Sequence, residues 1–154
     1  MLRISRLTDY ATVILGVLAE APERVHTAAA LAARTHIGQA TASKLLKQLQ
    51  RAALVTSSRG LHGGYKLARS ARDISAAAIL DALEGPLALT DCAVGHGHCG
   101  IEETCRVGRG WQRLNVAIRR SLADVSLAQL AGLDSAPIPI SHRELKDQIA
   151  NDHE

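Results

Sequence analysis

The residues of this 154-residue chain best suited to chemistry are its three cysteines, which all lie between residues 92 and 105. Six residues separate Cys92 from Cys99, and five separate Cys99 from Cys105. Thiolates are soft ligands that suit iron–sulfur clusters, zinc and copper(I). Zinc sites usually carry paired Cys-x-x-Cys knuckles, and this chain has none.

The backbone around these thiols is rich in glycine, at Gly95, Gly97 and Gly100. Glycine lets backbone amides approach a bound group closely, and the wide spacing lets a loop wrap an object larger than one ion. The pattern therefore favours an iron–sulfur cluster. A zinc ion and structural cysteines without metal are the alternatives.

The composition predicts a helical protein of the cytoplasm. Hydrophobic residues make up 47% of the chain, which is enough for a core, but there is no Phe, and Ala, Leu, Ile and Val must supply the packing. No apolar run is long enough to cross a membrane, and the N-terminus lacks a signal-peptide pattern. We therefore expect a cytoplasmic chain with reduced thiols and no membrane partner.

The net charge of +3 conceals two halves of opposite sign. Residues 1–72 carry 11 Lys and Arg against 3 Asp and Glu, whereas residues 73–154 carry 7 against 12. A basic half joined to an acidic half suggests that the first half meets a polyanion such as DNA. A solvated basic surface is the alternative.

Three helices are predicted in the basic half. Residues 8–22 place Tyr10, Ile14, Val17 and Leu18 on one face, with Thr8 as the expected N-cap. Residues 26–38 predict a short helix that Thr27 caps and Gly38 ends. Residues 39–54 follow at once, which is the spacing of a helix-turn-helix.

The third helix has one apolar and one polar face. Leu45, Leu46, Leu49 and Ala53 are expected to be buried. In a helix-turn-helix the second of its two helices enters the major groove, where hydroxyl and amide side chains reach bases and lysines reach phosphates. The predicted DNA contacts of this helix are Gln39, Thr41, Ser43, Lys44, Lys47 and Gln48. A merely solvated face is the alternative.

A hairpin is predicted directly after these helices. Residues 54–59 and 65–68 alternate like strands on either side of a glycine-rich tip. A hairpin in this position is a wing. Arg59 and His62 near its tip are expected to reach a minor groove, with Lys66 close to phosphate, unless Arg59 only forms a surface ion pair.

The second half predicts one helix before the cysteines and a longer one after them. The first, within residues 74–89, turns Ile79, Leu80 and Leu83 inward. The longer helix, over 109–125, carries an apolar stripe for which a small domain has little cover, so we expect homodimerisation; folding back is the alternative. The stripe consists of Trp111, Leu114, Ile118, Leu122 and Val125.

These elements define a mainly α fold with a small β-hairpin wing: a winged helix-turn-helix followed by a long dimerisation helix. We assign residues 1–72 to a DNA-binding domain and 73–133 to the cysteine loop and dimerisation helices. Residues 134–154 bear prolines and polar groups and form a C-terminal arm, for which partial helix and disorder are the two alternatives.

Several segments together resemble a known family. They are "LTDYA" near the start, the wing "RGLHGGYKLAR", the lead-in "EGPLALTDC" and the cysteine loop ending near Trp111. Over residues 1–133 the chain resembles iron–sulfur transcription regulators of the IscR/NsrR type, and among them the SUF-system regulators. The resemblance implies a repressor of iron–sulfur cluster assembly genes.

A cluster needs four protein ligands, and three thiols leave one position open. In the IscR branch a histidine three residues after the last cysteine fills it, but the matching residue here is Gly108. In the NsrR branch an aspartate of the partner's first helix can do so, and Asp9 matches it, although an acid there also suits the helix dipole. His96 and His98 are the next candidates, and Glu102 is a weaker one. The missing histidine favours a 4Fe–4S over a 2Fe–2S cluster.

The sequence thus predicts a cluster-sensing, DNA-binding homodimer that acts on a double-stranded operator. A nitric-oxide-sensing repressor of the same fold is one alternative. An iron–sulfur carrier or thiol redox protein that does not act on DNA is another, and the basic half disfavours it. No phosphate-binding loop or nucleophile motif indicates an enzyme.

Overall fold

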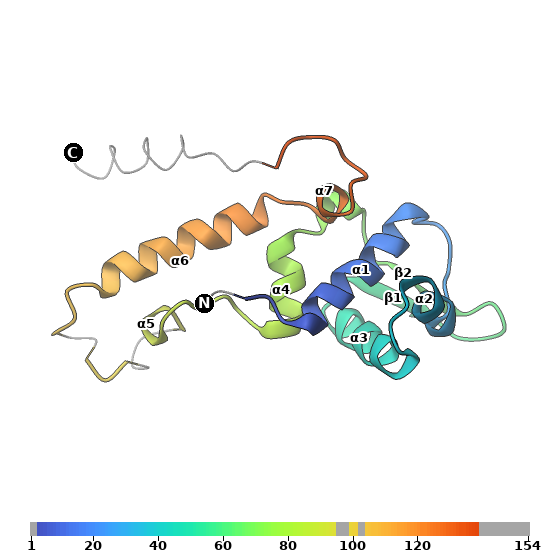
Figure 1. Cartoon of the computed structure of the whole chain (residues 1–154), viewed down its shortest axis with the longest axis horizontal. Coiled ribbons are helices and arrows are strands. Elements are labelled where there is room, and N and C mark those ends of the chain that lie inside the picture. The colour runs from blue at the N-terminus through green and yellow to red at the C-terminus, as the bar shows by residue number, and fades with distance from the viewer. Residues whose placement is uncertain (1–2, 95–98, 102–103, 139–154) are drawn as a thin grey trace.

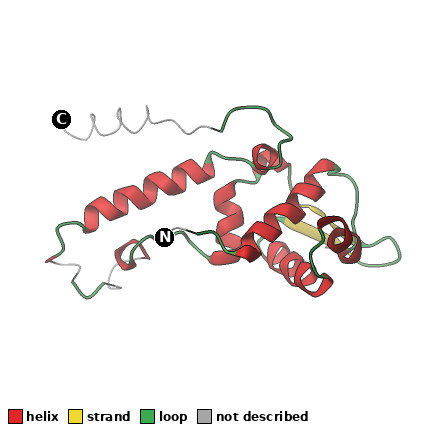
Figure 2. Ribbon diagram, in the orientation of Figure 1, coloured by secondary structure: helices red, strands yellow, loops and turns green. Residues whose placement is uncertain are grey.

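The computed structural model describes residues 3–94, 99–101 and 104–138, without the side chains of Cys92 and Val94. It is mostly helical with one two-stranded antiparallel hairpin, which confirms the predicted fold class (Figures 1 and 2). The elements in chain order are α1 (Arg6–Glu20), α2 (Ala28–Thr35), α3 (Gln39–Arg51), β1 (Val55–Ser58), β2 (Gly64–Leu67), the 3-10 helix η1 (Ala71–Asp73), α4 (Ala76–Glu84), α5 (Asp91–Val94), α6 (Gly108–Ala123) and α7 (Leu127–Leu130).

Helix α1 begins earlier than the sequence suggested. Its N-cap is Ser5, whose hydroxyl accepts a hydrogen bond from the Thr8 amide at 3.2 Å, so the expectation that Thr8 caps the helix is wrong. Thr8 is instead buried, and its hydroxyl donates to Glu84 at 2.6 Å. Ser5 and Thr8 are both residue types that cap helices well. Because the Thr8 hydroxyl bonds to Glu84, Ser5 is the residue that caps α1.

The helix-turn-helix is formed by α2, a tight turn and α3. Thr27 caps α2 as predicted, by accepting from the Ala30 amide at 3.1 Å. The helix ends at His36, which adopts the left-handed conformation with φ 56°, and not at Gly38. Gly38 directly precedes α3, and its carbonyl accepts from the Ala42 amide. Ile37 between them is buried, which fixes the turn on the core.

One aliphatic core holds the helices together. Its largest fully buried side chains include Ile14, Leu18, Leu31, Leu45, Leu46, Leu49, Ile79 and Leu127. Helices α4 and α7 contribute to the same core as α1 to α3, so the hydrophobic packing is continuous across residue 72. Ala53 corrects the prediction, because α3 ends at Arg51 and Ala53 is exposed with φ 56°.

The wing is the hairpin of residues 55–67. Val55 pairs with Leu67 and Ser58 with Gly64. The first strand is therefore shorter than the predicted 54–59, whereas the second has the predicted length and begins one residue earlier. His26 pairs with Tyr65 through two backbone hydrogen bonds of 2.9 and 2.8 Å and so ties the wing to the start of α2. The hairpin is thereby anchored at its base and projects from the helical body at the right of Figure 1.

After Glu84, at the end of α4, the chain leaves the body, and at Ser126 it returns beside Ser75, at the start of α4; we call residues 84–125 the excursion. Ser75 and Ser126 form a β-bridge, the Ala76 amide donates to the Val125 carbonyl at 2.8 Å, and the Leu127 amide donates to Ile74 at 2.7 Å. Helix α6 spans Gly108–Ala123, close to the predicted range, and lies beside the body with α5 near its start (Figure 1). Of the helices described, none is long and apolar enough to cross a membrane.

Candidate nucleic-acid interface and thiol site

The predicted DNA-contacting residues of α3 divide by exposure. Gln39, Lys44 and Lys47 are exposed, whereas Thr41, Ser43 and Gln48 are half-buried. The exposed lysines lie opposite the buried Leu45 and Leu49, so they can reach a phosphate backbone while α3 stays packed. Arg51, also exposed in the last turn, lies on the same side and was missed, although its spacing of four residues from Lys47 was a signal.

The two glutamines in the last turns of α3 differ in their hydrogen bonding. Nε2 of Gln50 donates to the Ser57 hydroxyl at 2.8 Å and so joins the helix to strand β1 of the wing. Gln48 has a buried Oε1 without a hydrogen-bond partner within the described part of the chain. Sequence reasoning missed the role of Gln50, because its partner lies in another element.

The wing carries the remaining predicted contacts. Arg59 and His62 lie in the connection between the strands and are exposed, and Lys66 is exposed on β2 opposite Thr56. The structure therefore brings cations of α3 and of the wing onto one anchored unit, because Gln50 and Ser57 bond the two elements. Such a unit presents a helix to one groove and a hairpin to the neighbouring one.

His26 at the base of the wing is the most deeply buried titratable side chain described, with 5% of its surface exposed. Its Nε2 has no hydrogen-bond partner among the residues that the structure describes. Burial lowers the pKa of His26, and the nearby charges of Arg24 and Arg34 lower it further. The residue whose backbone anchors the wing therefore has an imidazole that the fold favours in its neutral form.

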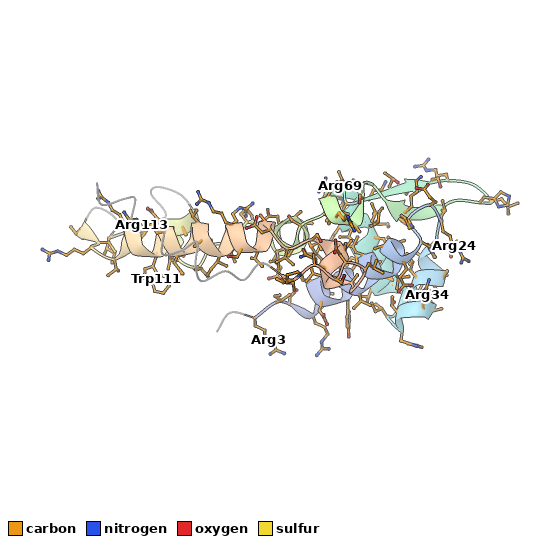
Figure 3. All side chains as sticks on the ribbon, turned by 90° about the horizontal axis from the view of Figure 1, so that it is seen from above. Arg3, Arg24, Arg34, Arg69, Trp111 and Arg113 are labelled. Carbon is orange, nitrogen blue, oxygen red and sulfur yellow. The ribbon has the colours of Figure 1, made fainter. Side chains whose placement is uncertain are left out.

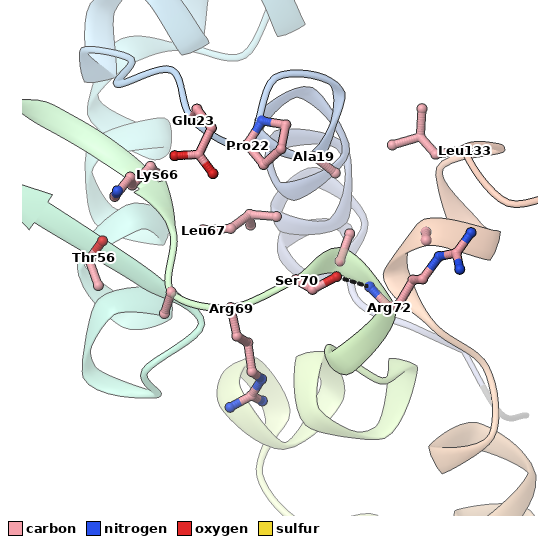
Figure 4. A pocket seen from close by; sticks show the side chains of 13 residues that line it. Ala19, Pro22, Glu23, Thr56, Lys66, Leu67, Arg69, Ser70, Arg72 and Leu133 are labelled. Atoms are coloured by element: carbon pink, nitrogen blue, oxygen red, sulfur yellow. Dashed lines mark hydrogen bonds between the residues drawn. The ribbon is translucent and has the colours of Figure 1, made fainter.

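An open pocket of about 590 Å³ lies between the base of the wing, the end of α1 and α7 (Figure 4). Two of the three cations that line it are engaged by the chain. Nε of Arg69 donates to the Asp73 carbonyl at 3.1 Å, and Nε of Arg72 lies 3.4 Å from a carboxylate oxygen of Asp134. Lys66, the third, is exposed on β2. The Arg72–Asp134 pair thus joins η1 to the segment after α7 at the edge of this pocket.

Helix α5 and the start of α6, which flank the cysteine segment, lie at the end of the excursion away from α3 (Figure 1). Cys99 and Cys105 are free and half-buried. Cys92 belongs to α5, but its side chain lies outside the described residues, as do His96, His98 and Glu102. Within the described part of one chain, no three His, Cys, Asp or Glu side chains gather closely enough to hold a metal.

The surroundings of Cys105 suit a thiolate-held group. A Cβ placed on Gly108 would lie 3.6 Å from Sγ of Cys105, so the sulfur faces the first turn of α6. No side chain caps this helix at Val107, and an open helix N-terminus favours an anionic neighbour. The free thiol of Cys105 beside it is the kind of ligand that holds an iron–sulfur cluster.

Asp9 lies in the first turn of α1 and is exposed. The exposed apolar side chains Ile4 and Leu7, 55% and 40% accessible, lie near it at the same end of the helix. An acid flanked by uncovered apolar groups is typical of a surface that meets another protein chain. The structure does not bring Asp9 together with the cysteines of its own chain in any metal-sized group of the described residues.

Hydrogen bonds join α1 to the excursion through a cluster that we call the Glu84 joint, made of Ser5, Thr8 and Glu84. One carboxylate oxygen of Glu84 accepts from the Thr8 hydroxyl at 2.6 Å and from the Ser5 amide at 2.9 Å. These bonds, that of Thr8 foremost, lower the pKa of Glu84. Gly85 follows with φ 85°, so the chain turns sharply as it enters the excursion.

Helix α6 holds the excursion from its inner face. Asn115 is buried, accepts from the Leu89 amide and donates to the Leu87 carbonyl, both at 3.1 Å. Arg119 makes a bidentate ion pair with Asp81 of α4, at 2.9 and 2.6 Å. The segment leading to the cysteines is therefore clamped between α6 and the Glu84 joint, and sequence reasoning missed both contacts.

The predicted dimerisation stripe is only partly covered by its own chain. Trp111 and Leu114 are 43% and 42% exposed, and Trp111 projects from the side of α6 in Figure 3. Ile118 and Leu122 are half-buried. Val125 lies beyond the end of α6 and is buried within its own chain, so it does not extend the exposed stripe. Val107, 64% exposed, extends it at the other end.

The helix-turn-helix, the anchored wing and the cations on both define a winged-helix regulator that binds DNA. Residues 4–132 match the Rrf2 family, described as iron-dependent transcriptional regulators. The chain belongs to this family. Its relatives are regulators of transcription and not enzymes.

Individual relatives and solved structures agree with this assignment. The regulator IscR of Vibrio atlanticus is 32% identical over 108 residues, which are 70% of this chain and 61% of the relative. The structure of IscR from T. potens is 25% identical, with a TM-score of 0.62 over 94% of this chain and 96% of that one. CymR, the global cysteine regulator of B. subtilis, is 25% identical, with a TM-score of 0.65 over 88% and 100%.

Proposed function

We propose that this protein is a cytoplasmic repressor of iron–sulfur cluster assembly genes that senses an iron–sulfur cluster. The observation that carries the proposal is the combination, on one Rrf2-family winged helix, of three closely spaced thiols with an uncapped helix N-terminus beside one of them. The division that we propose is one of roles, since one core spans residue 72: DNA binding up to residue 72, sensing and dimerisation up to 133, and an arm from 134.

Cys92, Cys99 and Cys105 are the proposed cluster ligands. When bound, a 4Fe–4S cluster would have one iron without a thiolate ligand. That iron would be the first to react with oxygen or nitric oxide, and the first to be lost when iron is scarce. The chain's own part is to supply the sulfur donors and to keep the first turn of α6 open beside Cys105. Gly108 contributes by leaving that space free of a side chain.

Asp9 of the partner subunit is the proposed fourth ligand, with His96 and His98 as the next candidates. Three features support Asp9: its exposure, its place in the first turn of α1 and the uncovered Ile4 and Leu7 near it. A ligand from the partner would make cluster retention depend on how the two protomers sit.

The homodimer is proposed to form along α6. The exposed stripe of Val107, Trp111 and Leu114, continued by the half-buried Ile118 and Leu122, supplies an apolar surface for a second copy. Two copies related by a twofold axis would present two α3 helices to half-sites of a roughly palindromic operator. The half-sites would lie about one helical turn, or a multiple of it, apart.

The path from thiols to DNA is proposed to run through the clamped segment. Asn115 fixes residues 87 and 89 to α6, and the Glu84 joint fixes the start of the excursion to the cap of α1. Helix α1 packs against α3 in the shared core. A rearrangement of the cysteine segment would therefore shift the placement of the recognition helix.

Two measurements test this function. Anaerobic purification should yield a brown protein with iron and acid-labile sulfide, and Cys99→Ser should abolish both.

Selection from a random-sequence pool should enrich a duplex with a twofold-symmetric pattern. Against that duplex, Lys44→Ala with Lys47→Ala should weaken binding and reduce the salt slope by about 2, whereas Arg72→Ala, whose guanidinium pairs with Asp134, serves as the charge control. A colourless protein after reconstitution, or the absence of any enriched sequence, would contradict the proposal.

A further inference from the structure

The wing tip presents a single apolar side chain to solvent. Leu61 is 96% exposed, whereas the other exposed large hydrophobic residues of the described chain range from 39% to 65%. It lies between Arg59 and His62, which are both exposed. The fold of the chain buries almost none of this leucine side chain, so Leu61 does not contribute to the core. Its place at the end of a polar, cationic hairpin suggests that a partner molecule contacts it.

The position of Leu61 is set by the glycines around it. Gly60 has φ 109°, and the Gly63 amide donates to the Gly60 carbonyl at 3.0 Å, which closes the turn. A Cβ on Gly63 would lie 2.4 Å from the Ser58 carbonyl oxygen, and one on Gly64 would lie 2.4 Å from that of His26. Only glycine fits these close approaches. The tip is therefore a tight turn with one fixed direction.

The wing beneath the tip is joined to the recognition helix. Gln50 of α3 donates to Ser57 at 2.8 Å, and His26 holds Tyr65 by two backbone hydrogen bonds. When α3 lies in a major groove, the tip of a wing joined to it reaches the adjacent minor groove. The flanking Arg59 and His62 supply positive charge on either side of Leu61, which suits the negative potential of that groove.

The geometry points to Leu61 as an apolar wedge that enters the minor groove and partly unstacks one base step. Leucine is among the side chains that minor-groove proteins insert in this way, and pyrimidine–purine steps open most easily. Leu61 would thus select operator sequence through DNA deformability, in addition to the contacts of α3. The inference rests on the proposed reading of DNA by α3 and the wing.

The test uses the full-length dimer and the duplex that the wild type enriches from a random pool, compared with a scrambled duplex. Leu61→Ala should lose roughly tenfold in affinity for the enriched duplex and less than about twofold for the scrambled one, with an unchanged salt slope because no phosphate contact is lost. Leu61→Met should retain most of the affinity. Leu130→Ala, which truncates a leucine 44% exposed on α7, is the matched control.

A second readout separates a wedge from mere surface contact. With 2-aminopurine placed at successive steps beneath the wing, wild-type binding should raise fluorescence at one step, and Leu61→Ala should abolish the rise. An unchanged affinity of Leu61→Ala, an equal loss on both duplexes, or no fluorescence rise with the wild type would overturn the wedge. Failure of the wild type to bind any duplex would overturn the proposed function as well. If the wedge fails by one of the other outcomes while Lys44→Ala with Lys47→Ala still weakens binding, the proposed function stands and only the wedge is wrong.

Discussion

At the scale of single residues, the fold lowers the pKa of one histidine, His26, and of one carboxylic acid, Glu84. His26 is buried where the wing meets α2, and its pKa is lowered by burial and by Arg24 and Arg34. Glu84 is held as a carboxylate by the donors of Thr8 and Ser5, which lower its pKa. Both groups bind protons more weakly in the folded than in the unfolded state, so acid works against the fold at each of them.

His26 sets the first prediction. Its folded pKa lies below the ordinary value of 6.5, so the unfolded state takes up its proton first as the pH falls. The free energy of unfolding should therefore decline as the pH falls through about 6.5, and His26→Gln should flatten that decline. Urea denaturation at a series of pH values measures it. His62→Gln, at the exposed wing tip, is the control, and an identical decline in His26→Gln would refute the assignment.

Gly108 sets a prediction about the thiol site. A Cβ there would be in ordinary contact with Sγ of Cys105, at 3.6 Å, so a histidine at this position would begin beside the thiol, and we expect it to supply a fourth ligand. Asp9→Ala should lose its cluster in air faster than the wild type, and adding Gly108→His should restore the lifetime. Absorbance decay and sulfide counts give the readout. Gly110→His, where a Cβ meets nothing within 4 Å, should restore nothing; equal rescue by both would refute the role of position 108.

At the scale of elements, the excursion is held at four places. The β-bridge of Ser75 and Ser126 closes its base, and the Glu84 joint ties its start to α1. Asn115 ties the next residues to α6, and the Arg119–Asp81 ion pair ties α6 to α4. The joint also includes the N-cap of the helix that carries Asp9. A structural change in the cysteine segment can therefore reach the DNA-binding body only through a few contacts. Each of these contacts can be removed by a single substitution.

Removal of the Glu84 carboxylate tests the joint. Glu84→Ala leaves the buried Thr8 hydroxyl and the Ser5 amide without their acceptor, which should cost about 1 kcal/mol because the carboxylate is exposed. It should also bring the DNA affinities of cluster-loaded and cluster-free protein within about tenfold of each other. Thermal melting and DNA titration measure the two effects. Glu23→Ala removes an exposed acid elsewhere, and a variant indistinguishable from it would rule out the joint.

The stripe on α6 gives a second prediction at this scale. Leu114→Asp places a charge in the centre of the proposed dimer interface and should raise the dimer dissociation constant at least about a hundredfold. Sedimentation equilibrium gives the oligomeric state. Val116→Asp is the matched control, because Val116 is 47% exposed on the opposite side of the same helix. A dimer that tolerates the first change as well as the second would place the interface elsewhere.

At the scale of the whole molecule, local patterns in the sequence were enough to predict the winged helix. Apolar spacing identified α1, α3 and α6, Thr27 marked the start of α2, and the glycine-rich tip marked the wing. What escaped prediction depends on contacts between distant segments. Thr8 is buried by Glu84, 76 residues away, so Ser5 caps α1 instead. His36 ends α2 in a conformation for which sequence rules favour glycine.

The sequence predicts the donor types of the proposed thiol site but not their geometry. Three cysteines at wide spacing indicate the kind of group that they would bind, since ligand chemistry follows residue type. The proposed fourth donor is different, because a ligand from a second subunit would leave no spacing pattern in the sequence. Asn115 illustrates the same difficulty, since an amide beside an apolar stripe gave no sign of the two backbone groups that it binds.

The central claim is that the cluster sets how firmly the dimer holds its operator. Titration of the enriched duplex under anaerobic conditions, with cluster-loaded and cluster-free protein at one salt concentration, tests it directly. Loaded protein should bind about a hundredfold more tightly, a difference of roughly 2.7 kcal/mol between the two states. Equal affinities of the two forms would contradict it.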